Sequence, residues 1–252
     1  MARLSRRKKT LLFFVALVVY AGCVALLLRG RYIASQPPDQ GEVTVHVRRE
    51  QPNEGVVLPP LKEIPAEKLL DVPFLVQAPF ANWDELHQET CEEASLMMVK
   101  YFKAGERFLS LEAADQEMKA LVAWETEAGY KVDVTVAELS AIAERYYSLT
   151  TGRVILNPSI DDIKREIADG RPVILPAAGR LLGNPNFTGQ GPPYHMLVIK
   201  GYTNSEFITN DPGTRQGESY RYSHQTIMEA MHDWHGSTSN ILQGKKAILV
   251  FD

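Results

Sequence analysis

Residues 90–102 read TCEEASLMMVKYF and predict a helix that begins at a cysteine. Threonine is a common N-cap residue, and Glu93, three positions after Thr90, completes a T-x-x-E capping box. Apolar side chains then recur at helical spacing as far as Phe102. Cys91 is therefore expected at the first helical position, where unpaired backbone N–H groups and the helix dipole favour a thiolate.

Cys91 has no obvious disulfide partner. The chain holds two cysteines, and the other, Cys23, falls within an apolar N-terminal run. A single thiol left over in an exported domain is exposed to oxidation. At this point two interpretations are open: a small buried apolar residue, or a reactive nucleophile.

The N-terminus has the pattern of a membrane anchor. Residues 1–10 are rich in lysine and arginine, and residues 11–28 are apolar and uncharged. A helix of that length spans roughly 27 Å, close to the thickness of the hydrocarbon layer. The basic residues are expected in the cytoplasm and the rest of the chain outside. A cleaved signal peptide and a lipoprotein signal at Cys23 are the alternatives.

The rest of the 252-residue chain divides into a linker and one folded domain. Residues 29–68 are rich in proline and are predicted to space the domain from the membrane, whereas residues 69–252 carry regular apolar patterns. The composition is 45% hydrophobic and 23% charged, with a formal net charge of −4. This balance gives no reason to expect a nucleic-acid partner.

Helix patterns come first in the domain and strand patterns follow, which predicts an α+β fold with a mostly antiparallel sheet. Helices are indicated by capping residues and helical periodicity, and strands by short runs of β-branched or apolar residues. The predicted helices cover residues 91–102, 110–118, 135–147, 159–170 and 223–234, and the predicted strands cover residues 172–177, 195–201, 206–209 and 247–251.

A nucleophilic thiol needs a general base. His195 is the best candidate, because it begins the strand HMLVIKGY directly after a loop rich in glycine and proline, which would bring it to a cleft. The other histidines lie in the linker, just before the cysteine helix, or in and beside a predicted surface helix; they are His46, His87, His224, His232 and His235. His232 and His235 are three residues apart but lack a third ligand, so no metal and no cofactor are predicted.

The base needs an orienting group, and Asp211 is the candidate. If the hairpin that follows His195 centres near Thr203, Asp211 stands directly opposite His195 and can hold its tautomer. A slip in register would substitute Asn210, whose amide can also orient an imidazole. The alternative interpretation of Asp211, within Asp-Pro-Gly, is a turn former.

An acyl transfer site also needs donors for the oxyanion. Gln77 ends an apolar run shortly before the cysteine helix, and Gln88 is its rival by proximity; the backbone N–H of Cys91 would be the other donor. Trp83 and Tyr194 are the predicted substrate-binding residues, although Trp83 could equally be a packing aromatic.

Four segments together carry a resemblance: DVPFLVQAPFANW, TCEEASLMMVKY, PYHMLVIKGY and FITNDPGT. They resemble the family 39-like cysteine peptidases, relatives of the bacteriocin-leader-processing domains in the papain-like clan, over roughly residues 69–252. The resemblance implies a papain-like fold, with N-terminal helices packed against a mostly antiparallel sheet. It also implies Cys91 as nucleophile, His195 as general base, Asp211 as orienting residue and Gln77 as oxyanion donor.

One departure concerns the glutamine. Leader-processing domains place it only a few residues before the cysteine, whereas a segment containing ANWDELH separates Gln77 from Cys91 here. No transporter segment or ATP-binding motif accompanies the domain, so leader processing is not the expected reaction.

The sequence therefore predicts a membrane-anchored, extracytoplasmic bacterial cysteine peptidase that acts on peptides or proteins through an acyl-enzyme. A cell-wall peptide amidase or acyl transferase with the same triad, and a non-catalytic peptide-binding domain, are the alternatives. The oligomeric state is left undetermined.

Overall fold

An antiparallel sheet and the helices packed around it make up residues 63–252, the part of the chain that this computed structural model describes. The predicted cytoplasmic segment 1–10, the predicted span 11–28 and nearly all of the linker 29–68 lie outside the described residues. Within residues 63–252, no helix combines the length and the apolar character needed to cross a bilayer.

The sheet has seven strands, all paired antiparallel. Six of them run in the order β2-β7-β3-β4-β5-β6, and β1 pairs with β4 off this path. The strands are β1 (Lys68–Leu69), β2 (Gly152–Leu156), β3 (Val173–Ala177), β4 (His195–Tyr202), β5 (Glu206–Asn210), β6 (Tyr220–Ser223) and β7 (Ala247–Phe251). Every residue of β4 is buried, which explains its continuous run of apolar residues.

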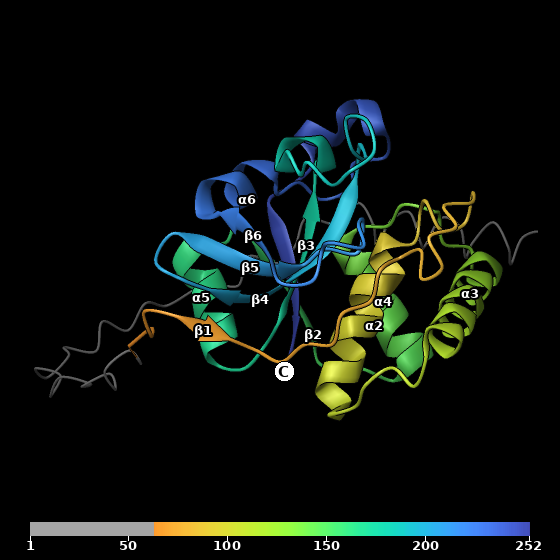
Figure 1. Ribbon diagram of the computed structural model, residues 1–252, viewed down its shortest axis with the longest axis horizontal. Coiled ribbons are helices and arrows are strands. Elements are labelled where there is room, and N and C mark those ends of the chain that lie inside the picture. Colours follow the sequence, from red (N-terminus) through yellow and green to blue (C-terminus); the bar gives the residue numbers. More distant parts are fainter. Residues whose placement is uncertain (1–62) are drawn as a thin grey trace, which may run out of the picture. The chain divides into compact units, whose positions relative to one another are not determined.

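Helices lie on both sides of the strands in Figure 1. One group is drawn on the right and contains α2 (Cys91–Ala104), α3 (Leu111–Ala128) and α4 (Val136–Tyr147); α5 (Ile160–Ala168) and α6 (His224–Ala230) lie on the left. Two short 3₁₀ helices, η1 (Gly179–Leu182) and η2 (Thr238–Gln243), complete the described elements. The predicted α+β class is confirmed.

Helix α2 packs directly on β4, and this contact forms the centre of the core. Leu96, Met97, Met98 and Val99 are all fully buried. The helix ends where Gly105 adopts a left-handed conformation and its N–H is bonded to the carbonyls of the last turn. Cys91 thus lies in the first turn of a helix whose middle is packed into the core.

The predicted capping box of α2 is wrong, although the helix does begin at Cys91. The Thr90 hydroxyl donates to the Gln77 carbonyl at 3.2 Å and caps no helical N–H. Glu93 is buried instead of returning to the N-cap. The tertiary bond to Gln77 offers Thr90 a partner that a local pattern does not reveal.

Capping boxes do form at two later predicted helix starts. Thr135 and Glu138 cap α4, and Ser159 and Asp162 cap α5, with both reciprocal bonds present in each case. Helix α3 runs further than predicted, to Ala128, and α6 is shorter than predicted. The sequence patterns do not identify β2 and β6, which lie at the two ends of the strand order.

The predicted register of the β4–β5 hairpin is also wrong. Val198 pairs with Asn210, and the turn is closed by the Thr203 N–H donating to the Glu206 carbonyl at 2.8 Å. The two residues between them form the loop, and a bulge shifts the register between Ile199 and Gly201. Asp211 therefore follows the end of β5 and is not a directly opposed strand residue.

Truncating the core face of α2 should destabilise the domain strongly. For Met97→Ala we expect a decrease of about 2–5 kcal/mol in the free energy of unfolding, because a fully buried side chain leaves a cavity against β4. Leu109→Ala is the matched control: Leu109 is 93% exposed, so its loss should stay within about 0.5 kcal/mol. Urea denaturation measures both, and equal values would contradict this packing.

Candidate active site

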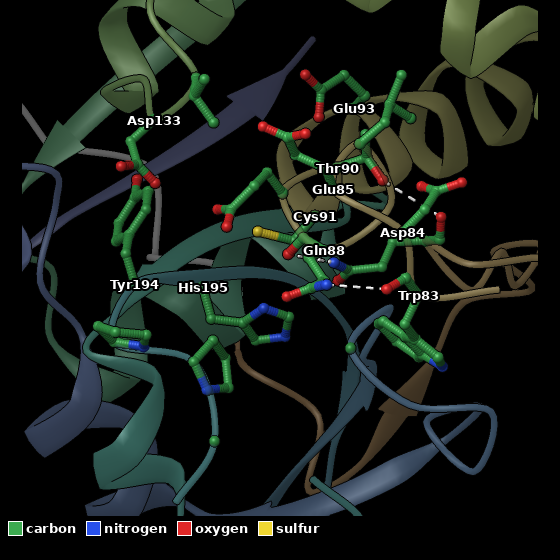
Figure 2. Close-up of a pocket in the computed structure, with 18 of the residues that line it drawn as sticks. Trp83, Asp84, Glu85, Gln88, Thr90, Cys91, Glu93, Asp133, Tyr194 and His195 are labelled. Atoms are coloured by element: carbon green, nitrogen blue, oxygen red, sulfur yellow. Dashed lines mark hydrogen bonds between the residues drawn. The ribbon is translucent and has the colours of Figure 1, made fainter. Parts of the chain in front are cut away.

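Cys91 occupies the N-terminal position of α2 and faces the start of β4. The backbone N–H of Met196, the residue after His195, is directed at the thiol and favours its ionised form. The side chain is buried, with 6% of its surface exposed. Figure 2 shows the sulfur of Cys91 and the ring of His195 facing the same space.

His195 is held by a buried carboxylate. Its Nε2 lies 2.8 Å from Asp211 Oδ1, and both side chains are almost completely excluded from solvent. With Nε2 engaged by Asp211, the other ring nitrogen, Nδ1, is the one available to a thiol. Asn210 takes no part, because its amide donates to the carbonyls of Val72 and Pro73.

Asp211 is held ionised by a full set of donors. Burial alone would raise its pKa, but the charge and hydrogen bond of His195 and the donors around it hold that pKa below its usual value. The donors are the Tyr222 hydroxyl at 2.6 Å, the Gly213 N–H at 3.0 Å and the Asn184 amide at 3.3 Å. Asp211 is therefore more than a turn former.

The imidazole is also confined by packing. The ring of Phe187 meets that of His195 edge to face, with centroids 5.4 Å apart. On another side, a Cβ atom at Gly213 would come within 2.8 Å of His195 Cε1, so this position admits only glycine without displacing the ring. These contacts leave the imidazole little freedom to rotate.

The thiol is protonated in this arrangement. Burial, together with the neighbouring charges of Glu92 and Glu93, raises the pKa of Cys91 well above its usual value. Cys91 Sγ donates to Glu92 Oε2 at 2.9 Å. Glu92 itself is 2% exposed, and burial raises its pKa to about 8. No pattern in the sequence indicates a role for Glu92, whereas in the structure it accepts the hydrogen bond of the Cys91 thiol.

The two candidate oxyanion amides are bonded differently. Gln77 Nε2 donates to the carbonyls of His87 and Gln88 at 2.9 and 3.0 Å, so both of its amide hydrogens are used. Gln88 Nε2 donates once, to the Trp83 carbonyl at 2.8 Å, and keeps one hydrogen. Both glutamines line the cavity that contains Cys91.

A cavity of about 1550 Å³ surrounds the thiol. Its lining includes Cys91, His195, Trp83 and Tyr194, so the two predicted substrate-binding aromatics do reach it. Trp83 is 38% exposed, whereas Tyr194 is buried and donates its hydroxyl to the Val134 carbonyl at 2.9 Å. Tyr194 is thereby fixed as a wall, and Trp83 is the more accessible of the two.

Sequence reasoning missed the residues that support Asp211 and the loop before α2. Tyr222 and Asn184 come from distant segments with no motif. His87 joins the loop to α3, with its two ring nitrogens each 2.7 Å from a carboxylate oxygen, one from Asp84 and one from Asp115. Among residues 63–252, no group of three or more histidine, cysteine, aspartate or glutamate side chains could hold a metal ion.

The comparisons with known proteins identify the family of this domain. The model of the peptidase C39-like family matches residues 69–240, which is more than half of the chain. The chain belongs to the peptidase C39-like family. Residues 69–240 include Cys91, His195 and Asp211, and the family relates this domain to cysteine peptidases.

One solved structure was also found in the comparison. A crystal structure described as a C39-like peptidase from Bacillus anthracis is 16% identical in sequence and covers 74% of this chain and 98% of its own, with a TM-score of 0.49. No curated protein matches the chain.

Removing the Tyr222 hydroxyl should weaken the C39-like domain at neutral pH. Because the folded pKa of Asp211 lies below its unfolded value of about 3.9, the stability that its charge contributes is fully present above that value and is lost as the pH falls through the folded pKa. For Tyr222→Phe we expect a loss of about 1.5–3 kcal/mol in unfolding free energy at pH 7, and a smaller loss once Asp211 is protonated.

Tyr220→Phe is the matched control for this measurement by urea denaturation. Tyr220 stacks on Tyr222 with centroids 4.8 Å apart, and its hydroxyl makes no hydrogen bond within the described residues. A loss from Tyr222→Phe that equals that of the control, or that does not change with pH, would contradict the role assigned to the hydroxyl.

Replacing Glu92 should change how stability depends on pH. An acid whose folded pKa is raised to about 8 destabilises the fold progressively as the pH rises from its unfolded pKa of about 4.3, by up to about 1.4 kcal/mol per pH unit. Glu92→Gln lacks this group, so the variant should become more stable relative to wild type between pH 5 and pH 8. Urea denaturation across that range measures the difference.

The control for this series is Glu144→Gln, since Glu144 is an exposed residue of α4. Its stability curve should run parallel to that of wild type. A Glu92→Gln curve that is also parallel to wild type would show that Glu92 is ionised at little cost, and would contradict the raised pKa.

Proposed function

We propose that this chain is a cysteine peptidase that works through Cys91, His195 and Asp211. The observation that carries the proposal is the buried 2.8 Å bond between His195 Nε2 and Asp211 Oδ1, beside a thiol at a helix N-terminus. Such an arrangement leaves Nδ1 free to accept the thiol proton and stabilises the imidazolium that then forms.

The reaction follows from these positions. The Cys91 proton passes to His195 Nδ1, and the thiolate sulfur attacks the carbonyl carbon of the substrate. The imidazolium then protonates the leaving amine as the C–N bond breaks, which leaves a thioester on Cys91. A water molecule, deprotonated by His195, attacks the thioester and releases the acid and the free thiol.

Glu92 sets a condition on the first step. The thiol donates to Glu92 in the observed geometry, so it has to leave that bond and turn to His195 before it ionises. Charge on Glu92 would oppose the thiolate, whereas the protonated acid would not. With the pKa of Glu92 at about 8, the neutral form predominates at pH 7.

The oxyanion would form near the backbone N–H of Cys91, which has no intrahelical acceptor. Gln88 has an undonated amide hydrogen, whereas Gln77 would first have to give up a bond to a carbonyl. We assign the second donor to Gln88. Gln77, the assignment implied by the family resemblance, serves here to hold the backbone of residues 87–88 in place.

The membrane anchor is part of the proposal. The basic segment 1–10 followed by the apolar run 11–28 supports a single-pass anchor, with the peptidase domain outside the cytoplasmic membrane. The proline-rich linker 29–68 would give the domain reach from the bilayer surface.

A second candidate is a peptide-binding domain without catalysis. The observation that favours it is the bond between Cys91 and Glu92, because a thiol with a raised pKa is a poor nucleophile. The intact pair of His195 and Asp211 favours the enzyme, since binding alone has no need of it.

Alkylation of the thiol separates the two candidates. We expect iodoacetamide to modify Cys91 in the full chain at pH 7 at least ten times faster than in His195→Ala, because the imidazole takes the proton from the thiol. Mass mapping of Cys91 distinguishes it from Cys23, and cleavage of a mixed peptide library is measured in parallel. Cys91→Ala is the control and should lack both signals.

The outcome that overturns the peptidase is specific. If Cys91 reacts no faster than glutathione and no faster than in His195→Ala, and the library stays intact, the non-catalytic peptide-binding domain is the better account.

Replacing the proposed oxyanion donor tests its assignment. Gln88→Ala should lower the peptide cleavage rate by about a hundredfold, as for other oxyanion donors.

A further inference from the structure

Two glutamates from different helices face the cavity on the other side of the nucleophile. Glu93 belongs to α2 and Glu125 to α3, with 4% and 6% of their surfaces exposed. Both line the cavity that contains Cys91. In Figure 2, Cys91 lies between His195 below it and the acidic residues Glu93 and Asp133 above it.

These two carboxyl groups are buried without a cationic partner. Glu93 Oε2 and Glu125 Oε1 accept no hydrogen bond from any N–H or O–H group, and no lysine or arginine of residues 63–252 pairs with either group. The carboxyl groups can bond to each other only when one of them is protonated. Burial raises the pKa of both; the charge and hydrogen bond of Glu125 raise the pKa of Glu93 further, whereas the hydrogen bond from Glu93 lowers the pKa of Glu125.

Burying these two carboxyl groups without a cation is energetically unfavourable. A buried carboxylate without a partner is among the most unfavourable groups in a protein interior, and a core position would serve better with an apolar residue. A cation that enters the cavity from solvent would replace the shared proton and satisfy the free oxygens. A positively charged group is therefore the kind of ligand that these two carboxyl groups suit.

The cavity lining near Glu93 and Glu125 would fit an alkyl chain that ends in a positive charge. Val122 lies one turn before Glu125 on α3, and Tyr130 and Val132 line the same cavity. Further acidic residues line it too, namely Asp84, Glu85, Glu89 and Asp133, against Lys131 and Arg215 as the basic residues. Apolar walls that lead to carboxylates suit an aliphatic stem with a cationic head.

We propose that Glu93 and Glu125 form a subsite that binds the ammonium or guanidinium group of a substrate side chain. The inference rests on the proposed peptidase function and specifies its substrate class. Glu93 belongs to the same first turn of α2 as Cys91, and both side chains line the same cavity. The charged side chain therefore belongs to a residue next to the scissile bond.

Matched peptides test the preference directly. The full-length chain is given peptides that differ at one residue beside the cleaved bond, which is lysine, arginine, norleucine or glutamate. We expect kcat/KM for the lysine or arginine peptide to exceed that for norleucine at least tenfold, and glutamate to be the poorest. In Glu125→Gln the ratio of lysine to norleucine should fall towards one, whereas Glu144→Gln, on the exposed side of α4, should keep the wild-type ratio.

A second measurement does not depend on peptide turnover. Cys91 is modified with aminoethyl methanethiosulfonate, which is cationic, and with the sulfonatoethyl reagent, which is anionic, and mass mapping reports the rate at Cys91. The ratio of the two rates, relative to the same ratio for glutathione, should exceed about ten in wild type. It should fall in Glu125→Gln and in Glu93→Gln; Glu125→Gln alone suffices if Glu93→Gln does not fold.

The outcomes separate the two proposals. A rate ratio equal to that of glutathione, or a norleucine peptide cleaved as well as the lysine peptide, overturns the subsite and leaves the peptidase standing. A charge preference that EDTA abolishes overturns it as well, because a metal ion would then account for the charge. Failure of the His195-dependent alkylation overturns the peptidase, while the reagent ratio still reports on the carboxylates.

Discussion

The buried hydrogen bond between His195 Nε2 and Asp211 Oδ1 is the constraint on which the site depends. It ties the first residue of β4 to the segment just after β5, and it needs the hairpin, its bulge and the turn at Gly213 to bring the two side chains within 2.8 Å. Tyr222 and Asn184 complete the shell of Asp211, which draws β6 and the loop after η1 into the same network. A carboxylate buried this deeply remains charged only because all of these donors are in place. The geometry of the candidate active site therefore depends on the packing of the sheet.

The first turn of α2 sets the opposite electrostatic condition. Three consecutive residues, Cys91, Glu92 and Glu93, are buried, and the two acids oppose a thiolate that the helix N-terminus would otherwise favour. Glu92 accepts the hydrogen bond of the thiol, and Glu93 lies beside Glu125 of α3. The two acidic residues beside Cys91 therefore have separate proposed roles. Glu92 accepts the hydrogen bond of the thiol before reaction, and Glu93 helps to bind the positive charge of the substrate.

Local sequence patterns predicted where helices and strands lie better than they predicted strand register and side-chain contacts. The starts of α2, α4 and α5 and the positions of β3, β4, β5 and β7 follow from capping residues and apolar runs, and the C39-like family from four ordered segments. The pairing of His195 with Asp211 was predicted from a strand register that is wrong, because the bulge and the two-residue turn shift it. The Thr90 capping box failed because Gln77, far along the chain, competes for the hydroxyl. The roles of Tyr222, Glu92 and Glu125 depend on burial and on contacts between distant segments, and no short pattern encodes these.

Trapping the acyl-enzyme tests the central claim most directly. The full-length chain is mixed with an activated peptide ester, quenched in acid within milliseconds to seconds, and its mass is measured intact and after digestion. The account predicts a thioester of the acyl group on Cys91 that disappears as product forms, that is absent in Cys91→Ala, and that accumulates far more slowly in His195→Ala. Product formation without an adduct on Cys91, or at an undiminished rate in Cys91→Ala, would contradict it.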